Sequence, residues 1–198
     1  MKSGKPISKI MIFIVGILLI MACTLPGLIP LTPMPKMEKN ADVVLEVLNG
    51  KDWYPLESLA KEHYTEEDFA KPGTLTFTVE NPNDKPVFFS YGWCAKDDQV
   101  LKQNLEHIEV RLYLNNDELG TEVVHNVSFK MNDGQSCSDF GVLFSEWPVG
   151  EYKLKAVASF DGKINDGFAD YEAGDYIFEY NVTVKEQKES VENAFFLS

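Results

Sequence analysis

Between residues 74 and 184, short segments in which apolar and polar residues alternate follow one another, separated by turn-forming residues. Such alternation places the apolar side chains on one face of a strand and the polar ones on the other. The clearest segments are 74–79, 87–93, 108–114, 123–129, 140–144, 152–158 and 176–184. Strands that follow one another without long helices predict an all-β fold, an antiparallel β-sandwich of about seven to eight strands.

The region before residue 74 has a different pattern. Val43, Leu45 and Val47 alternate with other residues and predict a first strand. Residues 55–63 carry apolar residues at helical spacing, and Thr65 precedes three acidic residues, which is typical of a helix N-cap. We therefore expect a short helical insertion before the main sheet, ended by Pro72-Gly73.

The segment Trp147-Pro148-Val149-Gly150-Glu151-Tyr152-Lys153-Leu154 resembles the penultimate-strand signature of immunoglobulin-like and fibronectin type III-like domains. In those domains a turn leads into a strand whose tyrosine packs at the corner of the sandwich. The resemblance covers roughly 40 residues and implies an immunoglobulin-like topology, but it carries no function. The cysteines depart from the antibody pattern, because Trp93 adjoins Cys94 instead of lying between two cysteines.

The chain begins with the features of a secretory signal peptide. Lys2, Lys5 and Lys9 precede an apolar run over residues 10–22, which ends in the small residue Ala22. This run is shorter than the roughly 20 apolar residues of a membrane-spanning helix. We therefore expect export, with an uncleaved N-terminal anchor as the alternative.

Ile20-Met21-Ala22-Cys23 resembles the lipobox of bacterial lipoproteins. The resemblance implies removal of residues 1–22 and attachment of fatty-acyl chains such as palmitate at Cys23, so that the membrane is a partner through lipid. It also implies an extracytoplasmic protein anchored to a bacterial cell membrane. The chain as a whole resembles uncharacterised bacterial surface lipoproteins with an immunoglobulin-like or fibronectin type III-like sandwich.

Four regions follow from these patterns: a signal peptide (1–22), a proline-rich tether (23–40), a sandwich domain (41–185) and a charged tail (186–198). The tether carries four prolines between residues 26 and 35, a density that favours an extended chain. The tail contains the apolar stretch Ala194-Phe195-Phe196-Leu197, which either packs back on the domain or remains disordered.

The chain is strongly acidic, with 18 basic and 31 acidic residues and a net charge of −13. Loss of the three leader lysines leaves 15 basic residues and a net charge of −16. Such acidity argues against nucleic-acid binding, which needs a basic surface, and against electrostatic docking on anionic lipid. Membrane attachment should therefore rest on acyl chains, of which stable anchoring needs at least two.

Cys94 and Cys137 are the two cysteines besides Cys23. Cysteines of an exported domain usually pair, so we expect a disulfide between them. Trp93-Cys94 ends an apolar segment, whereas Cys137 follows polar residues 134–136. The bridge is therefore predicted to pin a polar loop to the sheet.

The densest polar segment runs from Asp161 to Asp175 and contains three glycines. Its oxygen-bearing side chains include Asp161, Asn165, Asp166, Asp170 and Asp175, which are the ligand types that Ca²⁺ prefers. Their spacing does not match an EF-hand loop, and Asp and Asn beside glycine also form ordinary turns. We expect a structural turn, with a calcium site as the alternative.

No catalytic motif is present, and neither a metal site nor any other cofactor is expected. His107 and His125 are expected on neighbouring strands of one hairpin, which is too few ligands for zinc. Aromatic residues near loops or strand ends could bind a protein or stack on a glycan: Trp53, Tyr54, Trp93, Trp147, Phe168 and Tyr171. The sequence thus predicts a non-enzymatic binding, adhesion or scaffolding module at the cell envelope. A secreted carbohydrate-binding or glycan-acting protein is the alternative.

Overall fold

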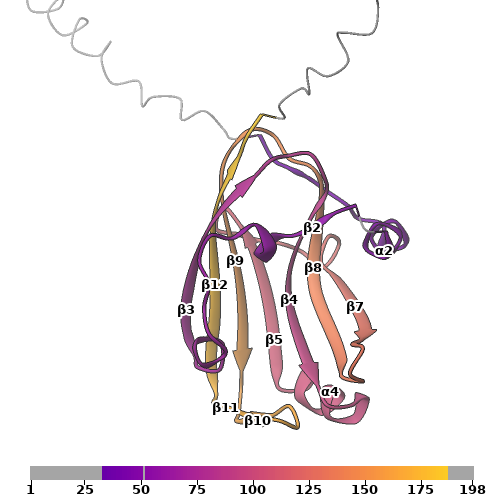
Figure 1. Ribbon diagram of the computed structural model, residues 1–198, viewed down its shortest axis with the longest axis vertical. Coiled ribbons are helices and arrows are strands. Elements are labelled where there is room, and N and C mark those ends of the chain that lie inside the picture. The colour runs from indigo at the N-terminus through magenta and orange to yellow at the C-terminus, as the bar shows by residue number, and fades with distance from the viewer. Residues whose placement is uncertain (1–32, 51, 187–198) are drawn as a thin grey trace, which may run out of the picture. The chain divides into compact units, whose positions relative to one another are not determined.

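The computed structural model describes residues 33–50 and 52–186 (Figure 1). Its strands are β1 (Lys36–Met37), β2 (Tyr54–Pro55), β3 (Gly73–Asn81), β4 (Val87–Ala95), β5 (Ile108–Leu114), β6 (Asp117–Glu118), β7 (His125–Lys130), β8 (Ser136–Glu146), β9 (Gly150–Phe160), β10 (Ile164–Asn165), β11 (Asp170–Tyr171) and β12 (Gly174–Val184). Its helices are α2 (Ala41–Asn49), the 3₁₀ turn η2 (Leu56–Leu59), α3 (Glu66–Phe69) and α4 (Asp98–Leu105). Within these ranges no helix is long and apolar enough to cross a membrane.

Two five-stranded sheets form a β-sandwich, so the predicted all-β class is confirmed. The first sheet has the order β1-β8-β4-β2, with β7 also paired to β8. The second has the order β3-β12-β9-β5-β6, and β10 pairs with β11 in a separate small hairpin. The pairing is not wholly antiparallel as predicted, because β3 runs parallel to β12 and β2 runs parallel to β4. The turn after β3 carries the chain into the other sheet, so β3 forms no hairpin with β4 and pairs instead with the last strand.

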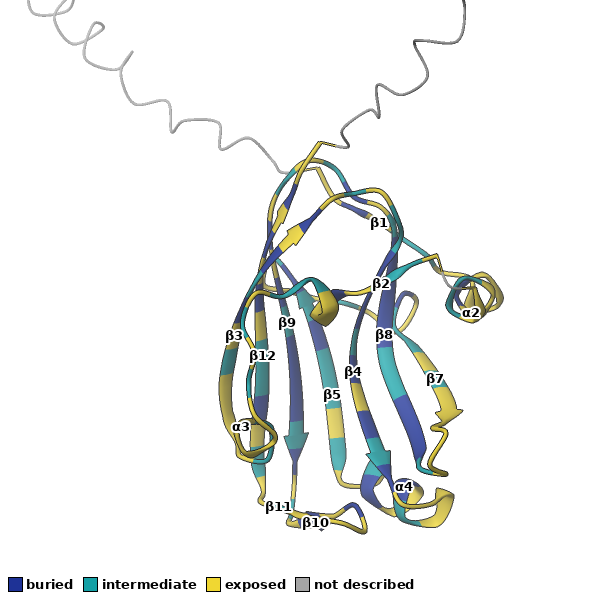
Figure 2. Cartoon of the chain, viewed as in Figure 1, coloured by how far each residue is buried: buried dark blue, intermediate teal, exposed yellow. Residues whose placement is uncertain are grey.

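One hydrophobic core fills the space between the sheets, where the inward-facing residues of both are buried (Figure 2). Phe77 of β3 stacks on Tyr180 of β12 within the second sheet, at 4.7 Å between centroids. Tyr180 also contacts Phe89 of β4 edge-on at 5.7 Å, and this pair joins the two layers. Such pairs add to the stabilisation that burial of their apolar area provides. The alternating pattern therefore identified the buried faces of β3, β5, β9 and β12.

The predicted first strand over residues 43–47 is wrong, because these residues belong to helix α2. Asn40 caps this helix, its side chain accepting a hydrogen bond from the backbone N–H of Asp42 at 2.9 Å. Val44 lies fully buried against Phe88 and Leu143 on the outer face of the first sheet. Almost every residue from 43 to 48 is apolar, so the segment fits a period of 3.6 as well as a period of two.

The end of the predicted tether belongs to the sandwich. Residues 36–37 form β1 and pair with β8, and the Tyr152 hydroxyl donates a hydrogen bond to the Pro33 carbonyl at 3.0 Å. The edge of β8 offers unpaired backbone groups that this short strand satisfies. Residues 33–37 of the predicted tether therefore contact the sandwich, while the tether residues before Pro33 lie outside the described part.

The helical insertion before the main sheet consists of two short pieces. Thr65 caps α3 as predicted, in a capping box where the side chains of Thr65 and Asp68 each accept a hydrogen bond from the backbone N–H of the other residue. Only Leu56–Leu59 of the predicted segment 55–63 is helical, because Ala60 pairs with Val79 and Lys61 bonds to Thr78 of β3. Pairing with the edge of β3 therefore ends the helix at Leu59.

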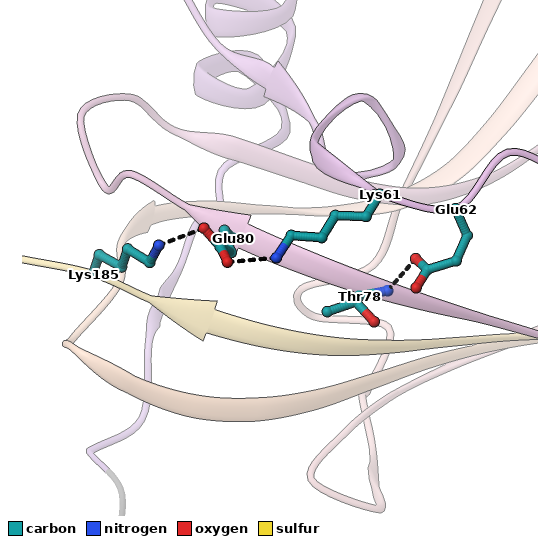
Figure 3. A network of polar contacts seen from close by, with 5 residues as sticks. All are labelled: Lys61, Glu62, Thr78, Glu80 and Lys185. Atoms are coloured by element: carbon teal, nitrogen blue, oxygen red, sulfur yellow. Dashed lines mark hydrogen bonds and ion pairs between the residues drawn. The ribbon is translucent and has the colours of Figure 1, made fainter.

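Charged residues hold the chain where it leaves the sandwich after β12 (Figure 3). Glu80 of β3 pairs with Lys185 on one side and with Lys61, at 2.5 Å, on the other. Hydrogen bonds from the two lysines, that of Lys185 foremost, lower the pKa of Glu80 to about 2. The segment that begins at residue 186 therefore starts from a fixed point beside β3.

Candidate binding surface

Helix α4, which the sequence did not predict, closes one end of the sandwich. Asp97 begins it by accepting hydrogen bonds from the backbone N–H groups of Gln99 and Val100, at 3.0 and 2.9 Å. The buried side chain of Asn104 donates to the carbonyl of Asn165 in β10 at 3.1 Å. Leu101 packs into the core between these polar contacts. The helix is therefore held rigidly beside the hairpin β10–β11.

Asp98 ties α4 to the first sheet. Its carboxylate accepts a hydrogen bond from the Ser136 hydroxyl at 2.6 Å and pairs with Lys130 at 3.0 Å. These two contacts, the hydrogen bond from Ser136 foremost, lower the pKa of Asp98. Because both carboxylate oxygens are already engaged, Asp98 serves to position α4 next to β7 and β8.

A groove of about 510 Å³ lies between α4 and β7. It is lined by Asp98, Leu101, Lys102, Leu105 and Glu106 of α4 and its end, and by Ser128, Phe129, Lys130, Ser136 and Cys137 of β7 and β8. Leucine and phenylalanine side chains form its apolar part, while two acidic and two basic residues balance each other. In a chain of net charge −13 this groove is locally neutral, so it suits an uncharged apolar occupant.

The strand beside the groove has a free edge. All six residues of β7 pair with β8, and β7 pairs with no second strand among the described residues. A free edge presents backbone N–H and C=O groups that an extended polypeptide can pair with. An edge next to an apolar groove is a known arrangement for peptide recognition, in which the backbone binds the edge and alternate side chains enter the groove.

Exposed apolar side chains gather at this end of the sandwich. Phe129 is 40% exposed, Met131 after β7 is 48% exposed and Phe168 between β10 and β11 is 68% exposed. The first described residue, Pro33, lies at the opposite end, near the start of β9 (Figure 1). The groove and these side chains therefore lie far from the point where the N-terminal segment joins the domain.

The groove carries binding groups but no catalytic pair. Its ten lining residues include no histidine, and Cys137 is engaged in a disulfide. Neither Ser128 nor Ser136 therefore has an imidazole base among the residues that line the groove, as a serine nucleophile needs. The arrangement is suited to holding a ligand.

The predicted disulfide between Cys94 and Cys137 is confirmed, but its setting differs from the prediction. Cys137 belongs to β8 and lies directly opposite Cys94 of β4, with the Cα atoms 4.1 Å apart. The bridge therefore joins two neighbouring strands and does not pin a loop. The sequence did not predict a strand at Cys137, because residues 134–136 are polar and one face of β8 is polar at this end.

The five calcium candidates are not gathered around one point. Asp161 contacts His107 at 2.8 Å, Asp175 accepts a hydrogen bond from Ser159 at 2.7 Å, and Asn165 donates to Asp170 at 2.6 Å. Asp166 is buried and accepts hydrogen bonds from the backbone N–H groups of residues 168 and 169 and from the Tyr171 hydroxyl. Over residues 33–50 and 52–186, no three His, Cys, Asp or Glu side chains lie close enough together to hold a metal ion. These side chains stabilise the turn around β10 and β11.

Addition of millimolar Ca²⁺ to the metal-free protein is expected to change the melting temperature no more than Mg²⁺ does. The reason is that the carboxylates of this loop already have protein partners, so only general screening of charge remains for the ions. Thermal melts in matched ionic strength check this. A rise of several degrees with Ca²⁺ alone would mean that the ion binds the native state specifically.

The two histidines lie beside strands of different sheets, which corrects their placement on one hairpin. His107 precedes β5, whereas His125 begins β7 and its Nε2 lies 2.9 Å from the Glu38 carbonyl. The chain crosses between the sheets after β6, and the turn signals in the sequence do not reveal that crossing.

The aromatic residues proposed for ligand stacking are mostly structural. Trp93 and Trp147 are buried in the core. Trp53 packs on Phe88 and donates hydrogen bonds to the carbonyls of Leu48 and Gly50. Tyr54 and Tyr171 are partly buried, which leaves Phe168 as the strongly exposed member of the set. These six residues therefore form no common aromatic platform.

Asp139 has a raised pKa, which the sequence did not predict. It lies in β8 opposite Gly92 of β4 and Val127 of β7, on the outer face of the first sheet. A Cβ atom built on Gly92 would lie 2.2 Å from its Oδ1 atom, so the carboxylate rests directly over the glycine. No described residue donates a hydrogen bond to it, and burial raises its pKa to about 6.

Cys23 lies outside the described residues, as do the signal peptide and the tail from residue 187. Lipid attachment at Cys23 and the signal peptide therefore remain predictions from the sequence.

No family model matches the chain, and no curated protein matches it. Among solved structures, it is similar to the cysteine protease inhibitor EhICP2 from Entamoeba histolytica, with 10% sequence identity and a TM-score of 0.27. That match covers 69% of this chain and 99% of the inhibitor. Amebosin is similar at 11% identity and a TM-score of 0.27, over 69% of this chain and all of amebosin. Likeness at this level transfers neither a topology nor a function.

Proposed function

We propose that the chain is a lipid-anchored, extracytoplasmic and non-enzymatic binding domain of the cell envelope, which takes an extended polypeptide at the α4–β7 groove. The free edge of β7 beside an apolar, locally neutral groove is the observation that carries this proposal. A groove of about 510 Å³ has room for two or three apolar side chains of such a ligand.

We also assign the sandwich to the immunoglobulin-like class. The Tyr152 hydroxyl lies 2.9 Å from the carbonyl oxygen of Pro148, four residues earlier, and its single hydrogen is shared between this carbonyl and that of Pro33. A tyrosine near the start of a strand, bonded to backbone slightly upstream, is the corner contact of immunoglobulin-like sandwiches. This contact supports the resemblance that the sequence around Trp147 has to such domains.

The arrangement of the domain supports display away from a membrane. The N-terminal segment joins at Pro33, at one end of the sandwich, and the groove lies at the other end. A chain attached to lipid at Cys23 would then present the α4–β7 groove outward, toward soluble or neighbouring partners. The disulfide fits an oxidising compartment outside the cytoplasm.

Replacing Cys23 with alanine is expected to abolish incorporation of a clickable fatty acid and to release the protein from the membrane fraction. The thiol of Cys23 is the acceptor that the lipobox-like sequence places next to the small residue Ala22. Labelling in cells followed by fractionation measures both effects, with the double variant C94A/C137A as a control that keeps Cys23. Continued labelling of C23A would contradict the lipid anchor.

The groove is tested by proximity cross-linking in the native envelope. Phe129→Ser removes an exposed apolar side chain of the groove, while Val149→Ser removes one of similar exposure (53%) at the opposite end. We expect partners that the parent and V149S capture to be lost from F129S. Equal capture by all three proteins would place the ligand elsewhere.

A further inference from the structure

We propose that the outer face of the second sheet binds a neutral glycan, at a site formed by the turn between β5 and β6 together with strands β9 and β12. The site lies apart from the α4–β7 groove and adds a second ligand to the proposed function. Two adjoining hollows mark it, of about 470 and 120 Å³. Both are lined by Asn116, Lys153 and Asn181, so one ligand can occupy the two. The larger hollow falls within the range of about 300–1,000 Å³ that is usual for small-molecule sites.

The pairing of three strands gathers polar side chains on this face. Strands β9, β12 and β3 lie side by side in the second sheet (Figure 1). Their outward-facing residues alternate with core residues and form rows of directly opposed partners. Two of these rows are Lys153–Asn181–Thr78 and Lys155–Glu179–Thr76. A ligand lying on this face therefore meets a hydrogen-bonding group about every 4.8 Å from strand to strand.

The turn between β5 and β6 contributes an amide to both hollows. Asn115 holds this turn against β9, because its Oδ1 atom accepts a hydrogen bond from the backbone N–H of Lys153 at 2.9 Å. The backbone N–H of Asn115 also donates to the Lys153 carbonyl at 2.7 Å. Asn116 follows in the turn, exposed and with a φ of 73°. Its side-chain amide has no hydrogen-bond partner among the described residues, so it is available to a ligand.

The charged side chains of the hollows are also available. Neither Lys153 nor Lys155 forms an ion pair within the described part of the chain, although Glu179 lies directly opposite Lys155. Lys155 is instead held over the ring of Tyr113, with its Nζ atom 4.4 Å from the ring centroid. Ion pairs elsewhere engage seven lysines: Lys36, Lys61, Lys71, Lys85, Lys130, Lys163 and Lys185. The polar groups of this face are therefore left for water or for a ligand.

The mixture of groups favours a neutral polyol over other ligands. Two lysines and two glutamates, Glu151 and Glu179, line the hollows, so their charges balance in a chain of net charge −13. An anion would meet the glutamates, a cation would meet the lysines, and an apolar ligand would desolvate both. A sugar hydroxyl both donates and accepts hydrogen bonds, so it can use the ammonium, carboxylate and amide groups together.

Glycan binding by the full-length protein tests the proposal. We expect the fluorescently labelled protein to bind neutral oligosaccharides on an array that also carries sialylated and sulfated glycans. Binding to the anionic glycans alone would overturn the inference, because the lysines would then act without the glutamates. Binding to no glycan of the array would overturn it as well.

Calorimetry with the neutral oligosaccharide that binds best on the array then locates the site. Asn181→Ala removes the amide of β12, and Asn116→Gly removes the amide of the turn while keeping a residue that accepts positive φ. Each variant is expected to bind about threefold to tenfold more weakly, the effect of one lost hydrogen bond. Asn132→Ala removes another exposed amide, in the turn after β7, and should bind like the parent. Unchanged binding in both N181A and N116G would overturn the inference.

Two further measurements separate this site from the α4–β7 groove. In NMR spectra of the parent, the oligosaccharide is expected to shift the backbone amide signals of Lys153 and Asn181 and to leave those of β7 in place. The groove variant F129S is expected to bind the oligosaccharide with the affinity of the parent. Loss of binding in F129S, or shifts confined to β7, would place the glycan in the groove and overturn the inference.

Discussion

The double variant C94A/C137A is expected to lose about 4 kcal/mol of its free energy of unfolding. The disulfide joins residues 43 positions apart, and in the chain-entropy account a closed loop of this length restricts the unfolded chain by about that amount. For a domain of this size the melting temperature should fall by roughly 8–16 °C. Alanine is the better replacement because Cys137 is fully buried, where a serine hydroxyl would need a hydrogen-bond partner.

Urea and thermal unfolding measure this effect, and reduction supplies the control. The parent protein in a reductant should unfold like the double variant, whereas the reductant should leave the double variant unaffected. Because Cys137 also lines the groove, the double variant should bind groove ligands more weakly even below its melting temperature. A loss of less than about 1 kcal/mol would mean that the reduced, unfolded chain keeps structure of its own.

Asp139→Asn is expected to stabilise the protein by about 2 kcal/mol at pH 7–8 and to have little effect near pH 4. Burial raises the pKa of Asp139 from 3.8 to about 6, so the folded state favours the protonated carboxyl. The charged form therefore costs stability, and this cost appears as the pH rises from about 4 to about 6 and remains above it. An asparagine has nearly the shape of the protonated side chain and never carries the charge.

Urea denaturation of the parent and of D139N between pH 4 and pH 8 measures the difference. Taking the difference between the two proteins cancels the titration of the other acidic residues, which share the same background. Asp117→Asn removes a carboxylate at an exposed position of β6 and is the matched control for the change of side chain. A difference between D139N and the parent that is the same at every pH would show that Asp139 titrates as in an exposed site.

Asp139 also shows why the sequence did not reveal a carboxyl group with a raised pKa. Burial raises its pKa, and the residues opposite it on the two neighbouring strands, Gly92 and Val127, lie 47 and 12 residues away in sequence. The pattern near residue 140 indicates a strand without revealing its extent or its neighbours. Strand pairing decides which groups shield a side chain from water, and pairing is a long-range property.

The sequence by itself determined the features that depend on near neighbours. Alternation over segments such as 74–79 and 176–184 follows from the period of a strand, and it identified both the β class and the buried faces. Thr65 was recognised as a cap because its hydrogen-bond partner lies three residues away. The pairing of Cys94 with Cys137 was predicted from the number of cysteines and from the expected export of the chain.

Only the tertiary structure decided which segments meet. Five of the six residues from 43 to 48 are apolar, so their pattern fits a strand and a helix equally well. The helix forms because Val44 packs against Phe88 and Leu143 on the outer face of β4 and β8. The parallel pairing joins β3, residues 73–81, to the last strand of the described fold, residues 174–184. The groove likewise arises from α4 and β7, whose residues carry no motif, because its shape depends on packing between segments distant in the chain.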